Sequence, residues 1–159
     1  MRHCLQITKW VLFGFLFLTH PVAAQERQWT LEASDKEAFL VFGVPETDDV
    51  GISFWCEIGP GKISLFVNNG PSNLKPSQTT KILVNLDGKK FSVKAKVTFD
   101  QKTFKPSVEG KFSIDDPLLL AAERANTLRV TLAKQTNSYP LVDAEISGLR
   151  RTCTGIAVN

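Results

Sequence analysis

The sequence predicts a mainly β protein, either an antiparallel β-sandwich or an open barrel, with one or two short helices. About eight short segments alternate apolar and polar residues with a period of two. Turn-forming residues separate these segments at regular intervals, which is typical of antiparallel all-β folds. Helical segments do not alternate with the strands, so a parallel α/β fold is not expected.

The first two hairpins are predicted in the N-terminal third of the domain. One joins residues 29–33 to residues 38–43 through a polar turn. The other joins residues 50–57 to residues 62–68 through a Gly-Pro-Gly turn. Its first strand places three residues on one face: Ile52, Phe54 and Cys56.

A third hairpin shows the clearest alternation in the chain. It joins residues 79–86 to residues 89–99 through Asp87-Gly88, a dipeptide that favours two-residue hairpin turns. A further strand is predicted at 107–114.

After residue 114 the alternating pattern ends and a helical pattern begins. Asp116 can accept hydrogen bonds from the first free amides of a helix, and Pro117 suits the first turn. A short helix is therefore predicted over about residues 116–126. Three segments complete the chain: strands at 128–132 and 139–146, and a helical turn or extended tail at 147–153.

Residues 1–24 have the organisation of a cleavable export signal. A basic start precedes the apolar run 10–18, and the small residues 22–24 suit a signal peptidase. Spanning a bilayer needs ~20 apolar residues, so no membrane span is predicted. We expect a periplasmic or secreted protein with a single β-rich domain over residues 25–159.

The predicted mature chain contains no histidine, because His3 and His20 both lie in the leader. Histidine-assisted nucleophiles and histidine-ligated zinc or copper sites are therefore excluded. The net charge falls from +3 to +1, since Arg2 and Lys9 leave with the leader. This balance gives no argument for a nucleic-acid partner. We expect a protein that is not an enzyme and uses no cofactor.

The cysteines suggest one cross-link. Cys4 leaves with the leader, and Cys56 and Cys153 remain. In an oxidising compartment these two most simply form a disulfide, which chain entropy would make worth ~4–5 kcal/mol. The alternative is a pair of buried free thiols.

Lysines are dense between residues 89 and 111. Lys90, Lys94 and Lys96 have the parity opposite to the apolar face of their strand, so one face of the sheet would be basic. This face is a candidate anion-binding patch for phospholipid headgroups, anionic glycans or an acidic protein. The alternative is a solvated face whose charges discourage edge-to-edge pairing.

Two aromatic residues also lie out of phase with the apolar face. If their strands pair, Trp55 and Phe66 stand on one outer face and form a candidate contact patch. The alternative is that both faces of the sheet are covered.

A short acidic segment is the only candidate for a metal site. Glu46, Asp48 and Asp49 lie in one loop, and carboxylate oxygens suit calcium. The spacing does not match an EF-hand loop, so the alternative is an acidic turn between strands. We expect no resident metal.

Four segments carry a resemblance to a known group: GVPETDD leading into ISFWCEIG, the leucine-rich LLLAAERA, and the closing SGLRRTC. With the N-terminal tryptophan hairpin, they resemble small exported β-rich proteins of Gram-negative bacteria. The closing arrangement is similar to the invasion-associated locus B group. The resemblance implies an envelope-located, non-catalytic β-sandwich, and it carries no functional residues to this chain.

The expected function is a non-enzymatic binding or accessory role in the cell envelope, with an envelope protein or an anionic envelope component as partner. One alternative is an inhibitor of a foreign hydrolase, with the loop 68–76 entering the target. The second alternative is a hydrolase that uses two carboxylates.

Overall fold

The computed structural model describes residues 26–99 and 105–155. The predicted leader over residues 1–24 lies outside this part of the chain. The elements of the described residues are the following: β1 (Gln28–Ala33), β2 (Glu37–Gly43), β3 (Val50–Glu57), β4 (Lys62–Val67), β5 (Thr79–Leu86), β6 (Lys89–Phe99), β7 (Pro106–Ser113), α1 (Pro117–Ala122), β8 (Thr127–Leu132), β9 (Gln135–Pro140) and α2 (Ile146–Cys153).

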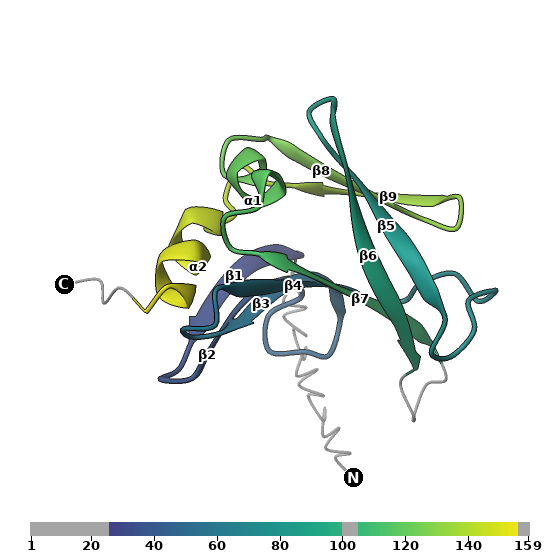
Figure 1. Cartoon of the computed structure of the whole chain (residues 1–159), viewed down its shortest axis with the longest axis horizontal. Coiled ribbons are helices and arrows are strands. Elements are labelled where there is room, and N and C mark those ends of the chain that lie inside the picture. The colour runs from purple at the N-terminus through teal and green to yellow at the C-terminus, as the bar shows by residue number, and fades with distance from the viewer. Residues whose placement is uncertain (1–25, 100–104, 156–159) are drawn as a thin grey trace, which may run out of the picture.

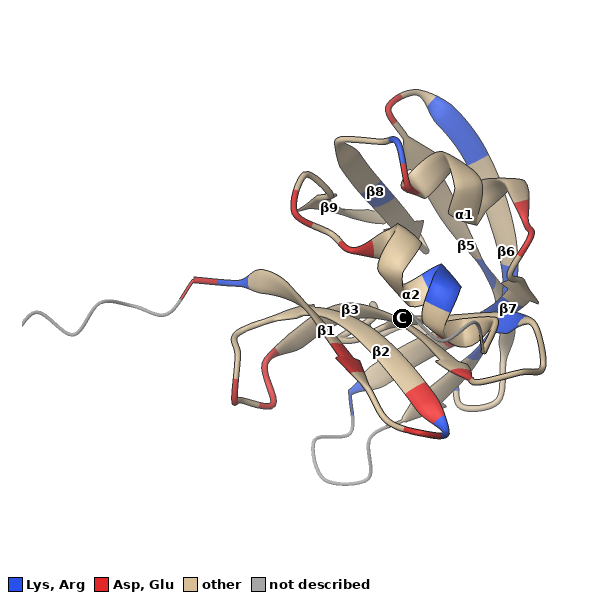
Figure 2. Ribbon diagram, turned by 90° about the vertical axis from the view of Figure 1, so that its left-hand side faces the viewer, with Lys and Arg blue, Asp and Glu red and all other residues tan. Residues whose placement is uncertain are grey.

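All nine strands belong to one antiparallel sheet in the order β1-β2-β3-β4-β7-β6-β5-β8-β9. The sheet curls into a half-barrel, and both helices lie on the same side of the molecule (Figures 1 and 2). The predicted fold class is confirmed in its open-barrel form. Strands that follow one another in the chain also pair in the sheet, except β4 with β5 and β7 with β8. In their place β4 pairs with β7, and β5 pairs with β8.

The concave side of the half-barrel holds the core. Alternate residues of each strand point inward, as their period of two requires. The largest fully buried side chains are Phe54, Leu40, Ile52, Ile63, Leu65, Ile82, Leu86, Leu118, Leu119, Leu128, Ile146 and Leu149. The opposite parity of the same strands therefore forms the convex face.

A glycine permits the tight curl between β6 and β7. A Cβ atom at Gly110 would lie 2.5 Å from Val93 Cγ1 and 3.1 Å from the Lys94 carbonyl oxygen. The absence of a side chain at this buried position lets the two strands approach.

The two edges of the sheet meet through side chains. The indole of Trp29 in β1 donates a hydrogen bond to the carbonyl oxygen of Pro140 at the end of β9. Phe42 and Tyr139 pack edge to face, with ring centroids 5.5 Å apart. These side-chain contacts connect β1 and β2 to β9, although the backbones of the edge strands β1 and β9 do not pair.

The first helix begins as predicted and ends earlier. The Asp116 side chain caps it by accepting a hydrogen bond from the Leu118 amide at 2.8 Å, and Pro117 occupies the first turn. The helix ends at Ala122, whereas the prediction extended to about residue 126. Within residues 26–99 and 105–155, no helix is long and apolar enough to cross a membrane.

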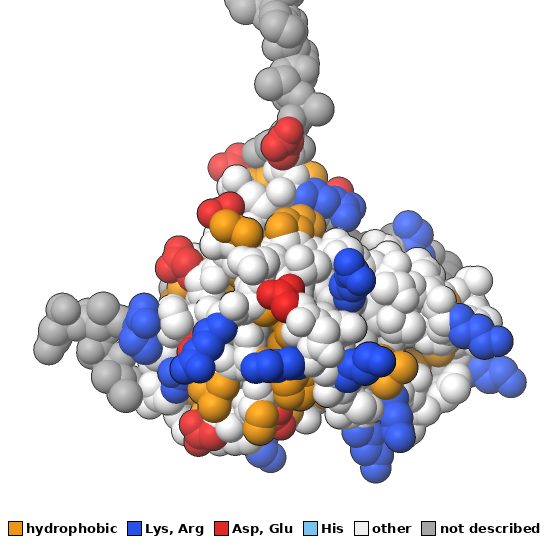
Figure 3. All heavy atoms as spheres, turned by 90° about the horizontal axis from the view of Figure 1, so that it is seen from above, with side chains coloured by type: hydrophobic (Ala, Val, Ile, Leu, Met, Phe, Trp, Pro, Cys, Tyr) orange, Lys and Arg blue, Asp and Glu red, His pale blue; other side chains and the backbone are white. Residues whose placement is uncertain are grey.

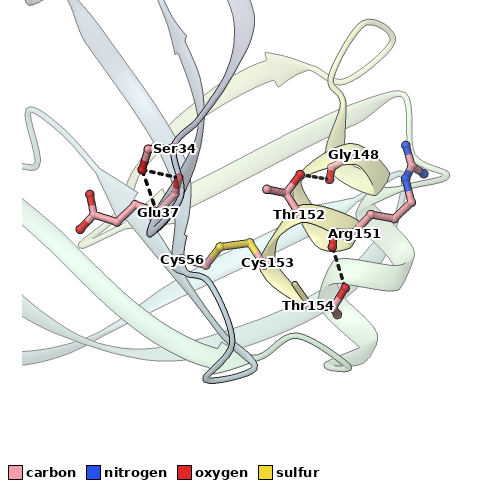
Figure 4. Close-up of a disulfide and its surroundings, with 8 residues drawn as sticks. All are labelled: Ser34, Glu37, Cys56, Gly148, Arg151, Thr152, Cys153 and Thr154. Carbon is pink, nitrogen blue, oxygen red and sulfur yellow. Dashed lines mark hydrogen bonds between the residues drawn. A yellow bond between two sulfur atoms is a disulfide. The ribbon is translucent and has the colours of Figure 1, made fainter. Parts of the chain in front are cut away.

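The predicted disulfide between Cys56 and Cys153 is confirmed (Figure 4). It ties α2 to β3 across 97 residues of sequence, with the two Cα atoms 5.9 Å apart. At Gly148 a Cβ atom would lie 3.1 Å from Leu31, so the glycine lets α2 pack closely on β1. Arg150 forms an ion pair with Glu123, which links α2 to the end of α1.

The last predicted strand, residues 139–146, is wrong. The structure places β9 at Gln135–Pro140, and Ile146 begins α2. The turn before β9 uses Ala133 and Lys134, with φ of 43° and 79°. Neither residue is a usual choice for positive φ, so these positions do not resemble a hairpin turn in the sequence.

Candidate ligand-binding face

The convex face is the outer side of six neighbouring strands, in the order β2, β3, β4, β7, β6 and β5. One row of outward-facing residues crosses it at right angles to the strands. Phe39 lies opposite Trp55, Trp55 opposite Ser64, and Ser64 opposite Lys111. At the far end of the face, Lys94 of β6 lies directly opposite Lys81 of β5. Five strand spacings of ~4.8 Å give the row a length of about 24 Å.

Aromatic side chains occupy the β2–β4 end of this row. The rings of Phe39 and Trp55 stack with centroids 6.0 Å apart and an interplanar angle of 16°. The ammonium of Lys111 lies over the Trp55 ring, 5.2 Å from its centre. Phe66 stands on the same face, opposite Ser53 on one side and Glu109 on the other. The structure therefore brings Trp55 and Phe66 to one surface, and both side chains are half-buried.

Cationic side chains occupy the β5–β7 end. Lys81 and Lys94 face each other across the β5–β6 pair, an arrangement of like charges that destabilises a sheet. Lys96 lies opposite Glu109, whose Oε1 atom is 3.6 Å from the Lys111 ammonium. This oxygen is buried and has no hydrogen-bond partner among the described residues.

Two hollows flank Lys111. The larger, of about 400 Å³, lies over β6 and β7 and is lined by Thr79, Lys94, Ala95, Lys96, Glu109 and Lys111. The smaller, of about 90 Å³, adjoins Trp55 and contains Glu57, Lys62 and Ser64. Each hollow therefore contains one carboxylate among the residues that the structure describes, whereas a two-carboxylate mechanism requires two acids at the same place.

The charge of the chain is divided between the two ends of this face. Residues 26–67, which form β1–β4, contain eight acidic and three basic residues. Residues 79–113, which span β5–β7, contain eight basic and three acidic residues. Figure 2 shows acidic residues at the ends of β1, β2 and β3 and basic residues on β5, β6 and β7. Such a division attracts an anion to one end of the face.

The structure separates the three predicted lysines. Lys94 and Lys96 line the larger hollow. Lys90 shares their face but lies opposite Asn85 near the hairpin end, about 14 Å along the strand from Lys94. We therefore exclude Lys90 from the hollow.

Sequence reasoning missed three members of the site: Lys81, Glu109 and Lys111. Their alternation within β5 and β7 placed them on one face of their own strands. It did not show that β7 lies beside β4, and this pairing puts Lys111 next to Trp55.

The acidic loop before β3 does not assemble a metal site. Asp49 forms a two-bonded ion pair with Arg27, at 2.6 and 3.2 Å. In the ranges that the structure describes, no three His, Cys, Asp or Glu side chains come together as metal ligands. Glu46 and Asp48 are exposed, as an acidic turn predicts.

The loop 68–76 is held against the end of the half-barrel. The amide of Gly70 donates to the Pro106 carbonyl, and Ser107 donates to the Asn68 side chain, both at 2.7 Å. Leu74 is 6% exposed and belongs to the core. An inhibitory loop has to project from the protein into a cleft of its target, whereas this loop is hydrogen-bonded to β7 and buries Leu74. No observation tests inhibition, so the inhibitor role stays a prediction.

A further hollow of about 400 Å³ lies between α1 and the β5–β6 hairpin. Leu120 and Phe91 provide apolar lining, and Lys89 and Arg124 are also at its edge. Seen from above, the molecule exposes hydrophobic side chains between Lys and Arg residues (Figure 3). The Asp87 carboxylate accepts hydrogen bonds from the amides of Asn126 and Thr127, so it fixes the hairpin to the start of β8.

Comparison of the chain with protein-family models, with curated proteins and with solved structures gives no match. The geometry of the convex face therefore carries the functional argument.

Proposed function

We propose that this protein is a non-catalytic binding module of the bacterial cell envelope that holds an anionic envelope component on its convex face. The observation that carries the proposal is the directly opposed pair Lys81 and Lys94 beside a hollow lined by further lysines. Like charges at this spacing reduce the stability of the sheet. A bound anion offsets that cost, so the arrangement favours a binding role over a merely solvated surface.

Two features support the location. A disulfide persists in oxidising compartments, and Cys56 and Cys153 form one. The first 24 residues have the pattern of an export signal. The periplasm or the extracellular space fits both.

The chemistry of the face supports binding rather than catalysis. Among the described residues that line its larger hollow, Glu109 is the one carboxylate. The chain after residue 24 has no histidine that could serve as a general base. An anionic protein or an anionic polymer of the envelope is the expected partner.

The test compares two double variants of the exported protein on the same strand. Lys94→Gln with Lys96→Gln removes two lysines of the hollow, and Lys89→Gln with Lys90→Gln removes two lysines near the hairpin end. Affinity for dextran sulfate is measured at low and high salt. We expect roughly tenfold weaker binding for the first variant and a much smaller loss for the second. Equal losses would show that net charge, not the hollow, determines binding.

A further inference from the structure

We propose that the anionic component is an acidic polysaccharide, a chain of sugars that carry carboxylate groups. One sugar residue occupies the larger hollow between β6 and β7, and the chain continues over Lys111 toward Trp55. This inference rests on the proposed function and names the class of ligand.

Glu109 is the first reason for this choice. A surface that binds only negative charge has no use for a carboxylate at its centre, because that carboxylate repels the ligand. Glu109 nevertheless stands between Lys96 and Lys111, with its buried Oε1 held 3.6 Å from the Lys111 ammonium and its side chain 26% exposed. The exposed part of this carboxylate can only accept hydrogen bonds, so it calls for a ligand that donates them. A sugar supplies both groups that the site needs, hydroxyls for Glu109 and a carboxylate for the lysines.

The size of the hollow is the second reason. Its volume of about 400 Å³ falls within the range of small-ligand sites. Lys94 and Lys96 line the hollow on the β6 side, and Glu109 and Lys111 line it on the β7 side. A single sugar ring can therefore contact cations and the acceptor at once.

The aromatic end is the third reason. Trp55 lies three strands from β6, about 14 Å away, which two or three sugar residues can span. Phe39 stacks on the Trp55 ring and Lys111 lies over it, so the sugar chain would pair a carboxylate with the Lys111 ammonium and contact only the part of the half-buried ring that stays exposed.

The same geometry argues against a bilayer as the partner. Trp55 is half-buried, with Phe39 stacked against it and Lys111 over its ring. A tryptophan that anchors a protein at a membrane interface has to reach the headgroup region with its ring. Here the ring lies against the sheet, and Glu109 adds a repulsive charge toward anionic headgroups.

The experiment compares four probes by titration calorimetry: oligogalacturonate, polyglutamate of equal charge, dextran, and phosphatidylglycerol–phosphatidylcholine vesicles. We expect oligogalacturonate to bind at least roughly tenfold more tightly than polyglutamate, the effect of one hydrogen bond to a charged group. Dextran, which has hydroxyls and no charge, should bind far more weakly than oligogalacturonate.

The variant Glu109→Gln sharpens the test, because it should move two affinities in opposite directions. Loss of the carboxylate weakens the hydrogen bond to a sugar hydroxyl, so oligogalacturonate binding falls several-fold. Loss of the negative charge removes repulsion, so polyglutamate binding rises. Glu32→Gln on the exposed part of β1 is the matched control and should change neither affinity.

The outcomes separate this inference from the proposed function. Equal affinity for all anionic probes, with both affinities rising in Glu109→Gln, would overturn the polysaccharide and leave an anion-binding module. Preference for the vesicles would overturn it in favour of a membrane surface. If no anionic probe bound, the proposed function and this inference would fail together.

Discussion

The two ends of the sheet are built differently. Strands β1–β4 are acidic overall, present aromatic rings on the convex face, and are joined covalently to α2 by the Cys56–Cys153 disulfide. Strands β5–β7 are basic and present lysines on the same face. The candidate site lies where the two ends meet, at the pairing of β4 with β7. One sheet therefore contains both a region cross-linked by a disulfide and a region rich in lysines.

This difference predicts which substitutions change the stability of the fold. Strands β1–β4 depend on the disulfide, and the junction around β7 depends on close packing at Gly110. Strands β5–β7 lose stability through repulsion between lysines. The changes below test these dependences, beginning with the largest expected effect.

Removal of the disulfide should have the largest effect. Cys56→Ala with Cys153→Ala should lower the free energy of unfolding by about 4–5 kcal/mol, because the cross-link closes a loop of nearly 100 residues. Urea denaturation measures the loss. Thr152→Ala, which removes only a side-chain hydrogen bond within α2, is the control and should cost less than about 1 kcal/mol.

If the covalent bracing is confined to the first end, proteolysis of the disulfide variant should begin around α2 and leave the β5–β6 hairpin intact. Simultaneous cleavage at both ends would contradict the comparison.

The junction should be sensitive to volume at one position. Gly110→Ala places a methyl group against Val93 and the Lys94 carbonyl, so it should cost about 1–3 kcal/mol of stability. Gly51→Ala is the matched control, because a Cβ there meets Tyr139 at an ordinary contact of 3.4 Å. Thermal denaturation compares the two variants, and equal melting temperatures would show that the junction is not tightly packed.

The charged end should gain stability when one of its opposed lysines is removed. Lys81→Thr relieves the repulsion with Lys94, so we expect a gain of about 0.2–1 kcal/mol at low salt. The gain should vanish at about 1 M salt, where screening is strong. Lys36→Thr, between Asp35 and Glu37 in the acidic end, should instead be neutral or destabilising. A loss of stability in Lys81→Thr at low salt would contradict the charge cost.

The smallest expected effect on stability is at Tyr139, where β9 packs against Phe42 of β2. Burial raises the pKa of Tyr139 above its ordinary value of 10.0, against smaller lowering effects of a hydrogen bond with Asn137 and of the Arg27 charge. The folded state therefore holds this proton more tightly than the unfolded state does. The contribution of this protonated phenol to folding stability is complete below pH 10.0 and is lost as the pH rises through the folded-state pKa.

Tyr139→Phe should abolish the part of the stability loss above pH 10 that comes from ionisation of this phenol. Because Tyr139 is the only tyrosine, phenolate absorbance titrates this group alone. A midpoint at or below 10.0 would contradict the burial effect.

Several elements were predictable because their causes are local. The alternation in residues 89–99 defined the inner and outer faces of β6, and Asp87-Gly88 defined the turn before it. Asp116 and Pro117 marked the start of α1. The disulfide followed from the number of cysteines left after the predicted leader. The hairpin at Ala133 and Lys134 was missed because its turn uses residues that rarely adopt positive φ.

The sequence by itself determined which side of each strand is apolar, since a period of two is a property of neighbouring residues. It could not determine which strands are neighbours, because many pairings bury the same alternating faces. Only the tertiary structure decided that β4 lies beside β7, and so that Trp55 and Phe66 share a surface with Lys94, Lys96 and Lys111. The physical reason is that strand order depends on the packing of the whole sheet, which neighbouring residues along one strand do not specify.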